Sequence, residues 1–313
     1  MAGDVSLSQT AKEIRITASD GAILEHAAFD IAVDETVRFI QPSSSSRVLN
    51  RISAAAPSVI DGKLIANGHV YLVNPAGVLF GENSVVEVGK LHAVAGSLTD
   101  QDFINSVDNF TALSGEVRNA GSITAGEVVL AGSSLTNSGR ISAPNGLVLL
   151  AVGGGLELSS PDGSLSVTLN EENPLGAAFA VGDLAGQALL QSGIIQASRV
   201  EIRGSAITHS GTVSASVAKL ANFSTFSGSS GSFAVENLSV SGGGDSGDAS
   251  TLDLSSKANS ISGLELAGVF ENFTLRSDSS LVLGPSAADS QAILQDSFKA
   301  QSLDLRVDEG GLA

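Results

Sequence analysis

The sequence predicts an all-β protein in which short strands wind into a stacked solenoid. A short pattern recurs at a fixed interval in the middle of the chain. Short runs of alternating apolar and polar residues are separated by turn residues, which is typical of β-strands. The 313 residues include 35 glycines, one tyrosine and no tryptophan. This composition suits repetitive β-structure with small side chains at its corners.

The repeat is visible in four segments that share the pattern polar-x-Gly-x-(Ile/Val)-x-Ala. Residues 119–125 and 137–143 form one pair and residues 191–197 and 209–215 another, with the same offset in both pairs (137 − 119 = 18 and 209 − 191 = 18). The second and third segments are three such periods apart (191 − 137 = 54), which leaves either two degenerate coils or an insertion between them. A repeat of this length with glycine corners is what a β-solenoid coil looks like.

In each coil we expect the Ile or Val and the Ala to point inward, with like residues stacked over like. Asn119 and Asn137 would then lie in consecutive coils and form a short amide ladder. A solenoid must also cover its ends, because open strand edges invite aggregation. The non-repeating residues 1–50 are the candidate for a β cap at the N-terminal end.

Before the repeats, the chain alternates between strand-like runs and turn residues. Residues 5–39 have period-two alternation broken by acidic turn residues. Further on, the apolar runs 70–73 and 78–80 flank residues 74–77, Asn-Pro-Ala-Gly. This residue order favours a type I turn, because Pro presets φ and Asn can bond its own backbone. We therefore expect a strand, a tight turn and a strand.

After the second repeat, residues 156–169 predict a hairpin around Asp162-Gly163, followed by a polar loop at residues 171–174. We expect part of this region to stand outside the coil stack. Residues 241–250 are a flexible Gly/Ser loop by composition, and residues 261–283 are again strand-like. The last part of the chain, from residue 284, is expected to form a short helix or to fray.

Composition excludes several classes of function. The net charge of −17 argues against a nucleic-acid partner, since such binding depends on clustered Lys and Arg. Arg38, Arg47 and Arg51 are the only basic grouping of note, and we interpret them as a surface patch. A chain without cysteine has no disulfide, no thiolate nucleophile and no Cys-based zinc site. There is no run of eighteen apolar residues, and residues 1–4 do not begin a signal peptide, so export would require a leader that has been removed or mis-annotated.

No motif for catalysis, a cofactor or a metal stands out. Residues 244–247 mimic a protease nucleophile loop, but a serine is inert without a positioned base. The single GGGD stretch lacks the tandem copies of a calcium-binding β-roll. The histidines never fall at HExxH spacing, which favours surface or satisfied polar residues. We therefore expect no catalytic residue, no cofactor and no metal.

Four ordered blocks resemble the N-terminal domain of filamentous haemagglutinin-like exoproteins, the secreted partners of two-partner secretion. They are residues 22–32, 35–46, 48–52 and 64–81. The resemblance implies a right-handed parallel β-helix with an N-terminal cap. It also implies Sec export to the periplasm, recognition by a dedicated outer-membrane β-barrel transporter, and passage to the cell surface.

The expected organisation follows from the repeats and the resemblance together. Residues 1–240 would form a two-partner secretion domain, with the cap at about 1–50 and coils at about 50–240. Residues 241–313 would add further coils or a C-terminal extension, and the predicted hairpin would stand outside the helix.

The family's Asn-Pro-Asn-Gly-Ile signature falls on Asn74, Pro75, Ala76, Gly77 and Val78, with Ala76 in place of the second Asn. One interpretation is a structural turn that closes a coil, and the other is direct contact with the transporter. The two are compatible, because the fold-nucleating end can itself be the signal. The same interpretations apply to Asn50 and Arg51.

The expected function is that of a non-enzymatic, monomeric exoprotein, or its secretion domain, which an outer-membrane transporter with periplasmic recognition modules captures. Strand pairing with those modules would contribute. The exported protein would act as an adhesin for a host or cell-surface ligand at the surface of a Gram-negative-type bacterium. Two alternatives stay open. One is a polysaccharide lyase or hydrolase with paired carboxylates as acid and base, although the acids here are scattered. The other is a passive adhesin that reaches the surface by another route.

Overall fold

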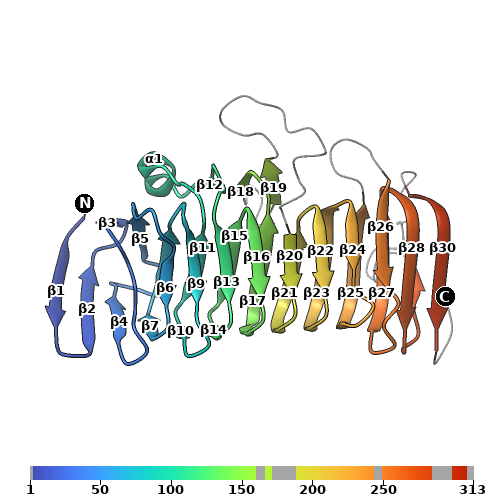
Figure 1. The fold of residues 1–313 in the computed structure, drawn as a ribbon, viewed down its shortest axis with the longest axis horizontal. Helices are drawn as coiled ribbons and strands as arrows, with labels where there is room; N and C mark the ends of the chain where they lie inside the picture. Colours follow the sequence, from blue (N-terminus) through green and yellow to red (C-terminus); the bar gives the residue numbers. More distant parts are fainter. Residues whose placement is uncertain (1–2, 160–165, 171–187, 243–248, 284–297, 309–313) are drawn as a thin grey trace.

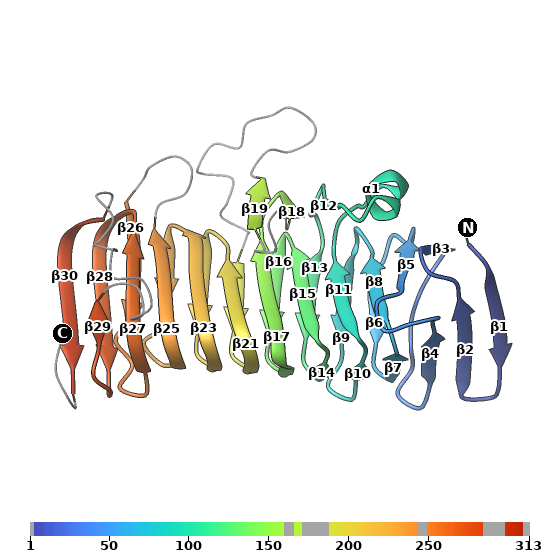
Figure 2. The same cartoon turned by 180° about the vertical axis from the view of Figure 1, so that it is seen from behind.

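The structure is a computed structural model, and it describes residues 3–159, 166–170, 188–242, 249–283 and 298–308. It is an elongated stack of coils that runs from β1 at one end to β30 at the other (Figure 1). Viewed from behind, the strands keep the same order along the stack (Figure 2).

The coils contribute strands to three faces of the stack, called here face 1, face 2 and face 3. Face 1 contains β2 (Glu13–Ala18), β4 (Thr36–Ile40), β7 (Lys63–Ala66), β10 (Val85–Glu87) and β14 (Ser122–Thr124). Face 2 contains β3 (Ala22–His26), β5 (Arg47–Ile52), β8 (His69–Val73), β11 (Lys90–Val94), β15 (Glu127–Gly132) and β29 (Val282–Leu283).

Five long strands bend through faces 1 and 2 and join them into one 17-stranded sheet. They are β17 (Arg140–Val152), β21 (Ile194–Arg203), β23 (Thr212–Phe223), β25 (Ser232–Gly242) and β27 (Ser260–Ala267). Face 3 is a separate 10-stranded sheet. It contains β6 (Ser58–Ile60), β9 (Gly77–Phe80), β13 (Glu116–Asn119), β16 (Ser134–Asn137), β20 (Ala188–Gln191), β22 (Ala206–His209), β24 (Thr225–Ser227), β26 (Ser250–Leu254), β28 (Val269–Ser277) and β30 (Lys299–Val307).

Strands in the three faces pair in parallel, which confirms the predicted parallel β-helix. The repeats lie in register: Asn119 pairs with Asn137, and Gln191 pairs with His209. Strand β16 pairs directly with β20, so that Asn137 lies beside Gln191. The long interval between the second and third repeats is therefore one coil step that carries an insertion, not two degenerate coils.

The interior of the stack is filled by the residues that the repeat predicts to point inward. Ile123, Ile141, Ile195 and Val213 follow one another across face 1 and are completely buried. Full burial of such a side chain contributes about 1.5–3 kcal/mol. Towards the C-terminal end the interior is filled by phenylalanines. The following are completely buried there: Phe223, Phe226, Phe233, Phe270 and Phe273.

The predicted amide ladder is present and is longer than expected. Nδ2 of Asn119 donates to Oδ1 of Asn137 at 2.8 Å, and Nδ2 of Asn137 donates to Oε1 of Gln191 at 2.6 Å. Gln191 then donates to the carbonyl of Gly193 at 3.0 Å. All three amide side chains are completely buried, so each depends on its neighbours for hydrogen bonds.

At the N-terminal end, β1 (Val5–Gln9) pairs antiparallel with β2, and parallel pairing begins with β2 and β4. The first fifty residues therefore contain an antiparallel covering strand and the first parallel strands. At the other end β30 pairs with β28, so the expected helix or frayed end is wrong for residues 299–307, where regular strand pairing takes up the backbone hydrogen bonds. Most of the 241–250 loop and residues 284–297 lie outside the described residues.

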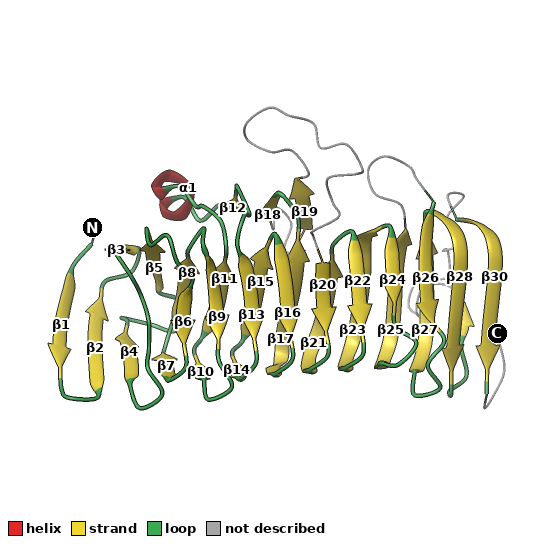
Figure 3. Cartoon of the chain, viewed as in Figure 1, coloured by secondary structure: helices red, strands yellow, loops and turns green. Residues whose placement is uncertain are grey.

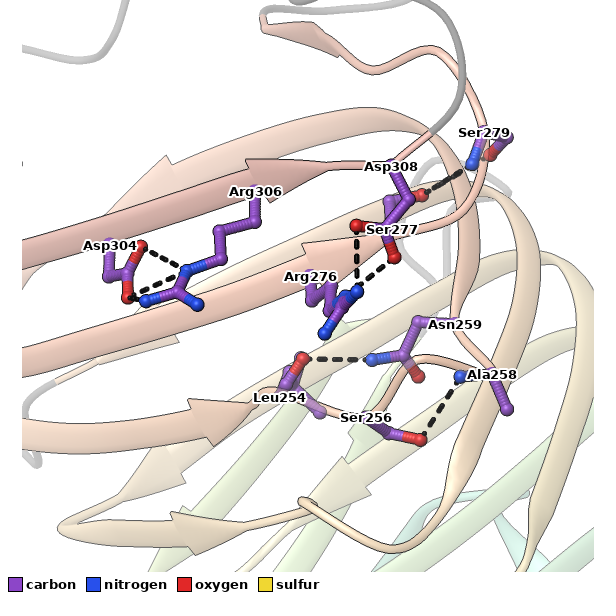
Figure 4. Close-up of polar contacts among 10 residues, drawn as sticks. All are labelled: Leu254, Ser256, Ala258, Asn259, Arg276, Ser277, Ser279, Asp304, Arg306 and Asp308. Atoms are coloured by element: carbon purple, nitrogen blue, oxygen red, sulfur yellow. Dashed lines mark hydrogen bonds and ion pairs between the residues drawn. The ribbon is translucent and has the colours of Figure 1, made fainter.

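Polar contacts tie the C-terminal coils together (Figure 4). Arg276 on β28 donates from Nε and Nη2 to Asp308, just after β30, at 2.6 and 2.8 Å. The Asn259 amide donates to the Leu254 carbonyl at 2.9 Å. On β30 itself, Arg306 donates to Asp304. The Arg276–Asp308 contact links neighbouring coils, the Asn259 contact lies at the turn between β26 and β27, and the Arg306–Asp304 contact lies along one strand.

Face 2 carries an additional layer on its outer side, visible as the helix and the strands that stand above the stack (Figure 3). It consists of α1 (Asp100–Ile104), β12 (Asp108–Phe110), β18 (Gly155–Ser159) and β19 (Ser166–Asn170), and we call it the cover. The antiparallel pair β18–β19 confirms the predicted extra-helical hairpin. The hairpin's turn and the polar loop at 171–174 lie outside the described residues.

The cover exists because the outer side of face 2 is apolar. Leu49, Val129 and Leu149 point outward from β5, β15 and β17 and are completely buried in a second hydrophobic cluster. Phe103 of α1 and Phe110 of β12 pack into the same cluster and are also completely buried. Between β5 and β17, face 2 is thus buried on both sides, as a core sheet is.

Candidate functional site

The turn at residues 74–77 forms the corner where the chain leaves face 2 and enters face 3. The Gly77 N–H donates to the Asn74 carbonyl at 2.9 Å, and the Ala76 N–H donates to the Asn74 side-chain oxygen at 3.0 Å. The predicted strand, tight turn and strand are therefore confirmed. Because β8 and β9 belong to different sheets, the turn closes a coil and does not make a hairpin.

The Asn74 side chain is completely buried and ties this corner to the preceding coil. Its Nδ2 donates to the Ala56 carbonyl and to Oγ of Ser58, both at 3.1 Å. In the following coil, Oγ of Ser114 donates to the Pro75 carbonyl at 3.0 Å. The corner is thus bonded to the coils on both sides.

Position 77 requires a glycine, both because of its backbone conformation and because neighbouring atoms leave no room for a side chain. Its φ is +129°, a region that side chains rarely adopt. A Cβ at this position would lie 2.8 Å from the Glu116 carbonyl oxygen. Val78 is completely buried, Ala76 is half-buried and Pro75 is exposed. Pro75 and Ala76 are therefore the part of residues 74–78 that is accessible at the surface of the folded protein.

Asn50, on β5, points into the stack and is completely buried. Its Nδ2 donates to the Tyr71 carbonyl at 3.2 Å, and its Oδ1 lies 3.0 Å from Nε2 of His26. The amide therefore bridges the coil before it and the coil after it. Burial lowers the pKa of His26, although the hydrogen bond with Asn50 opposes this effect.

Arg51 and Arg47 point to the outer side of β5 and hold α1 in place. Arg51 pairs with Glu25 and with Asp100, both at 2.6 Å, and donates to the Leu98 carbonyl at 2.8 Å. Arg47 donates to the Phe103 carbonyl at 3.0 Å, and its guanidinium lies 5.0 Å from the centre of the Phe103 ring.

The interpretation of the arginines as a surface patch is therefore wrong. Arg38 pairs with Glu13 at 2.9 Å on face 1, away from the two arginines of β5. Arg47 and Arg51 each contact the cover: Arg47 donates to a backbone carbonyl and stacks on a ring, and Arg51 pairs with a carboxylate. Their role in the fold is to attach α1 to face 2.

The two groups of predicted site residues lie in consecutive coils at the same corner. Asn50 pairs with Leu72 and Arg51 pairs with Val73, so the β5 residues sit one coil before the end of β8, where Asn74 follows. The structure therefore brings these residues together. The asparagines face inward, whereas Pro75, Ala76 and part of Arg51 remain accessible.

A polar cluster between face 2 and the cover was not predicted from the sequence. Tyr71 and His92 lie side by side on β8 and β11, with ring centres 4.5 Å apart. The Tyr71 hydroxyl donates to Asp108 of β12 at 3.1 Å, and Nε2 of His92 lies 3.0 Å from Glu127. Only the coil register, which places residues 71 and 92 next to each other, could have revealed it.

Burial and neighbouring groups shift the pKa of two side chains in this cluster. Burial opposes ionisation of Glu127, but the hydrogen bond and charge of His92, together with Lys90, lower its pKa to about 2. Burial, with the nearby Asp108 carboxylate, raises the pKa of Tyr71. Tyr71 and His92 are each only 3% exposed. The cluster is closed to a substrate, and its contacts link the cover to the sheet.

Among the described residues no group of His, Cys, Asp and Glu side chains is arranged to hold a metal ion. Nor does any helix in that part of the chain have the length and apolar character needed to cross a membrane.

Comparison with known proteins agrees with this architecture. Residues 5–267 match the family model described as the TPS secretion domain. The solved HMW1 secretion domain from Haemophilus influenzae superposes with a TM-score of 0.63 at 20% identity, covering 99% of this chain and 80% of that one. The filamentous hemagglutinin secretion domain superposes with a TM-score of 0.54 at 12% identity, covering 99% and 97%. At these identities the two structures support the fold.

Two related sequences are heme/hemopexin-binding proteins of Haemophilus influenzae. The protein of strain ATCC 51907 / DSM 11121 / KW20 / Rd is 35% identical over 156 residues, which is 46% of this chain and 17% of the relative. The other is 39% identical over 80 residues, which is 26% of this chain and 9% of the relative. The matched segments thus cover less than a fifth of the length of these relatives.

Proposed function

This chain belongs to the TPS secretion-domain family, and on that premise we propose that the corner at residues 74–77 is the part that an outer-membrane transporter recognises. The partner would be a β-barrel transporter with periplasmic modules, which captures the exoprotein after Sec export and passes it to the cell surface. The N-terminal coils would form before capture, and the rest of the chain would cross in an extended form and stack its coils outside the cell.

The observation that carries this proposal is the construction of the corner at residues 74–77. Asn74 and Asn50 are completely buried and bond neighbouring coils, so both act by building the N-terminal coils. Pro75 is exposed and Ala76 half-buried at the same corner. A partner that reads this surface would therefore also read whether the first coils have formed.

The experiment distinguishes direct contact between the corner and the transporter from an effect of the corner on folding. The chain is produced with a leader, together with its transporter, and secretion is compared for Pro75→Ala and Asn74→Ala. Asn74→Ala removes three hydrogen bonds of a buried amide, so it should lower both secretion and the stability of the purified protein. Pro75→Ala removes an exposed side chain and should lower secretion with little loss of stability.

A matched control is Glu82→Ala, an exposed change shortly after β9, which should leave both quantities unaltered. If secretion of the Pro75 and Asn74 variants equals that of the unchanged protein, the corner is not the recognition site. If secretion follows stability alone across the variants, the corner acts only through the fold.

For the exported protein as a whole we propose the role of a surface adhesin on a Gram-negative-type bacterium. Family membership supports an exported protein, and the comparisons give no support to the alternative of a polysaccharide lyase or hydrolase. Adhesion of cells that carry the complete exoprotein, compared with cells that lack it, tests this role. Equal adhesion of the two cell types would refute it.

A further inference from the structure

Strand β1 is paired on one side only. Val5–Gln9 bonds antiparallel to β2, and no other described strand pairs with it. Four of its five residues are exposed, and the Leu7 side chain, at 67% exposure, is the most exposed large hydrophobic residue among those described. The free side of a strand presents unpaired N–H and C=O groups that can bond another strand.

The hydrogen-bond pattern between β1 and β2 shows which backbone groups of β1 face this free side. In an antiparallel pair, residues alternate between those that bond the neighbour and those that point away from it. The Ser19 N–H donates to the Asp4 carbonyl, and the Thr10 N–H donates to the Glu13 carbonyl, so residues 4 and 10 direct their backbone N–H and C=O groups towards β2. By alternation Ser6 and Ser8 do the same, whereas Val5, Leu7 and Gln9 direct their N–H and C=O groups to the free edge.

The other strands at this end of the stack are protected. On face 3, the Val59 carbonyl accepts from Ile31, and the Val59 N–H donates to Asp30. On face 2, the residues Ala22 to Leu24 of β3 are at most 3% exposed. Strand β1 is therefore the accessible edge at the N-terminal end of the described structure.

Natural edge strands are usually blocked by a charged residue, a proline or a bulge. The sequence of β1, Val-Ser-Leu-Ser-Gln, contains neither a charged residue nor a proline, although the chain carries a net charge of −17. Its pairing with β2 is regular over all five residues, without a bulge. The features that normally prevent strand addition are absent from this strand.

Both sides of the edge offer apolar contacts for an added strand. Leu7 pairs with Ile16 and so points to the inward side of the sheet. On the outward side, Ser6 and Thr17 line a depression of about 440 Å³ together with Ile40, which is 42% exposed. An added strand places alternate side chains on these two sides, which gives specificity beyond the main-chain bonds.

We propose that an extended segment of the transporter's periplasmic module adds to the free edge of β1 as a further strand. This inference rests on the proposed function and adds a second contact with the transporter, at β1, to the one proposed at the corner of residues 74–77. The bonds would join main-chain groups of the module to Val5, Leu7 and Gln9. A segment with an apolar residue placed to meet Leu7 or Ile40 fits this edge.

The test uses the 313-residue protein and the separately produced periplasmic region of its transporter. Amide hydrogen exchange measured by NMR should show that the Val5, Leu7 and Gln9 amides exchange rapidly in the free protein and become protected in the complex. Affinity is compared for Gln9→Pro and Gln9→Ala. The proline removes one N–H of the free edge without breaking a bond to β2, whereas the alanine keeps it. The dissociation constant should rise about tenfold for the proline variant, the loss of roughly one hydrogen bond, and little for the alanine.

The outcomes separate this inference from the proposed function. If the unchanged protein does not bind the periplasmic region, the proposed function itself fails. If it binds while these three amides stay unprotected and the two Gln9 variants bind equally, the inference about β1 is wrong and transporter recognition stands. If the protein alone forms dimers that Gln9→Pro dissociates, the edge belongs to a second copy of the chain and the inference is again overturned.

Discussion

The amide ladder in the interior of face 3 should be a major source of stability, and Asn137 is the place to test it. In Asn137→Ala, Nδ2 of Asn119 and Oε1 of Gln191 each lose their partner. All three side chains are completely buried, so water cannot replace these bonds. A buried polar group left without a partner costs about 1–3 kcal/mol, so the two together predict a loss of about 2–6 kcal/mol.

The assay is unfolding in urea, followed by circular dichroism, with the free energy taken from the midpoint and slope. The control is Thr136→Ala, the neighbouring residue on the outer side of β16, where a change should stay within about 0.5 kcal/mol. Asn119→Ala and the double variant complete a mutant cycle. The coupling between the two asparagines should be about 1 kcal/mol or more.

Two results would refute this reasoning. One is a loss for Asn137→Ala as small as that of Thr136→Ala. The other is strict additivity of the two asparagine variants, since residues that share a hydrogen bond cannot contribute independently.

Three further predictions concern other parts of the stack. Burial lowers the pKa of His209 from 6.5 to about 4, against the opposing hydrogen bond with the Ser232 backbone. The unfolded state therefore binds the proton at a higher pH than the folded state, and the free energy of unfolding should fall by about 2 kcal/mol between about pH 7.5 and about pH 5. Urea unfolding at these two pH values measures the change. His209→Gln should lack this pH-dependent loss of stability. Arg51→Ala should speed amide exchange in residues 98–105 by detaching α1, whereas Arg118→Ala, on the exposed side of face 3, should leave that exchange unaltered. Gly77→Ala should cost at least about 1 kcal/mol more than Gly21→Ala in thermal unfolding, because both have positive φ but only Gly77 lacks room for a Cβ.

The prediction of the coils succeeded because it depended on a local pattern that is repeated. In a strand, alternate residues face opposite sides, so the constant offset between repeats fixes which residues stack. The inward positions of Ile123 and Ile141 and the ladder between Asn119 and Asn137 follow from that offset alone. From the sequence, the long interval between the second and third repeats could be either an insertion or two degenerate coils. The sequence does not show that β16 and β20 are neighbours, which is the observation that decides for an insertion.

The candidate site was only partly predictable. The residue order Asn-Pro-Ala-Gly predicted the turn, because its hydrogen bonds join residues of the turn itself. The burial of Asn74 and Asn50 was not predictable, because their partners lie in neighbouring coils. The role of Pro75 and Ala76 in contacting the transporter remains a prediction.

By itself, the sequence determined the strand content, the register of the regular coils and the corner turn, since each depends on residues close together or on a fixed repeat. Contacts between distant segments were needed to show that Arg47 and Arg51 hold α1, that a cover buries the outer side of face 2 between β5 and β17, and that no other described strand pairs with the second edge of β1. The physical reason is distance along the chain. Arg47 and Phe103 are 56 residues apart, and no local pattern indicates which distant segment will cover an apolar surface.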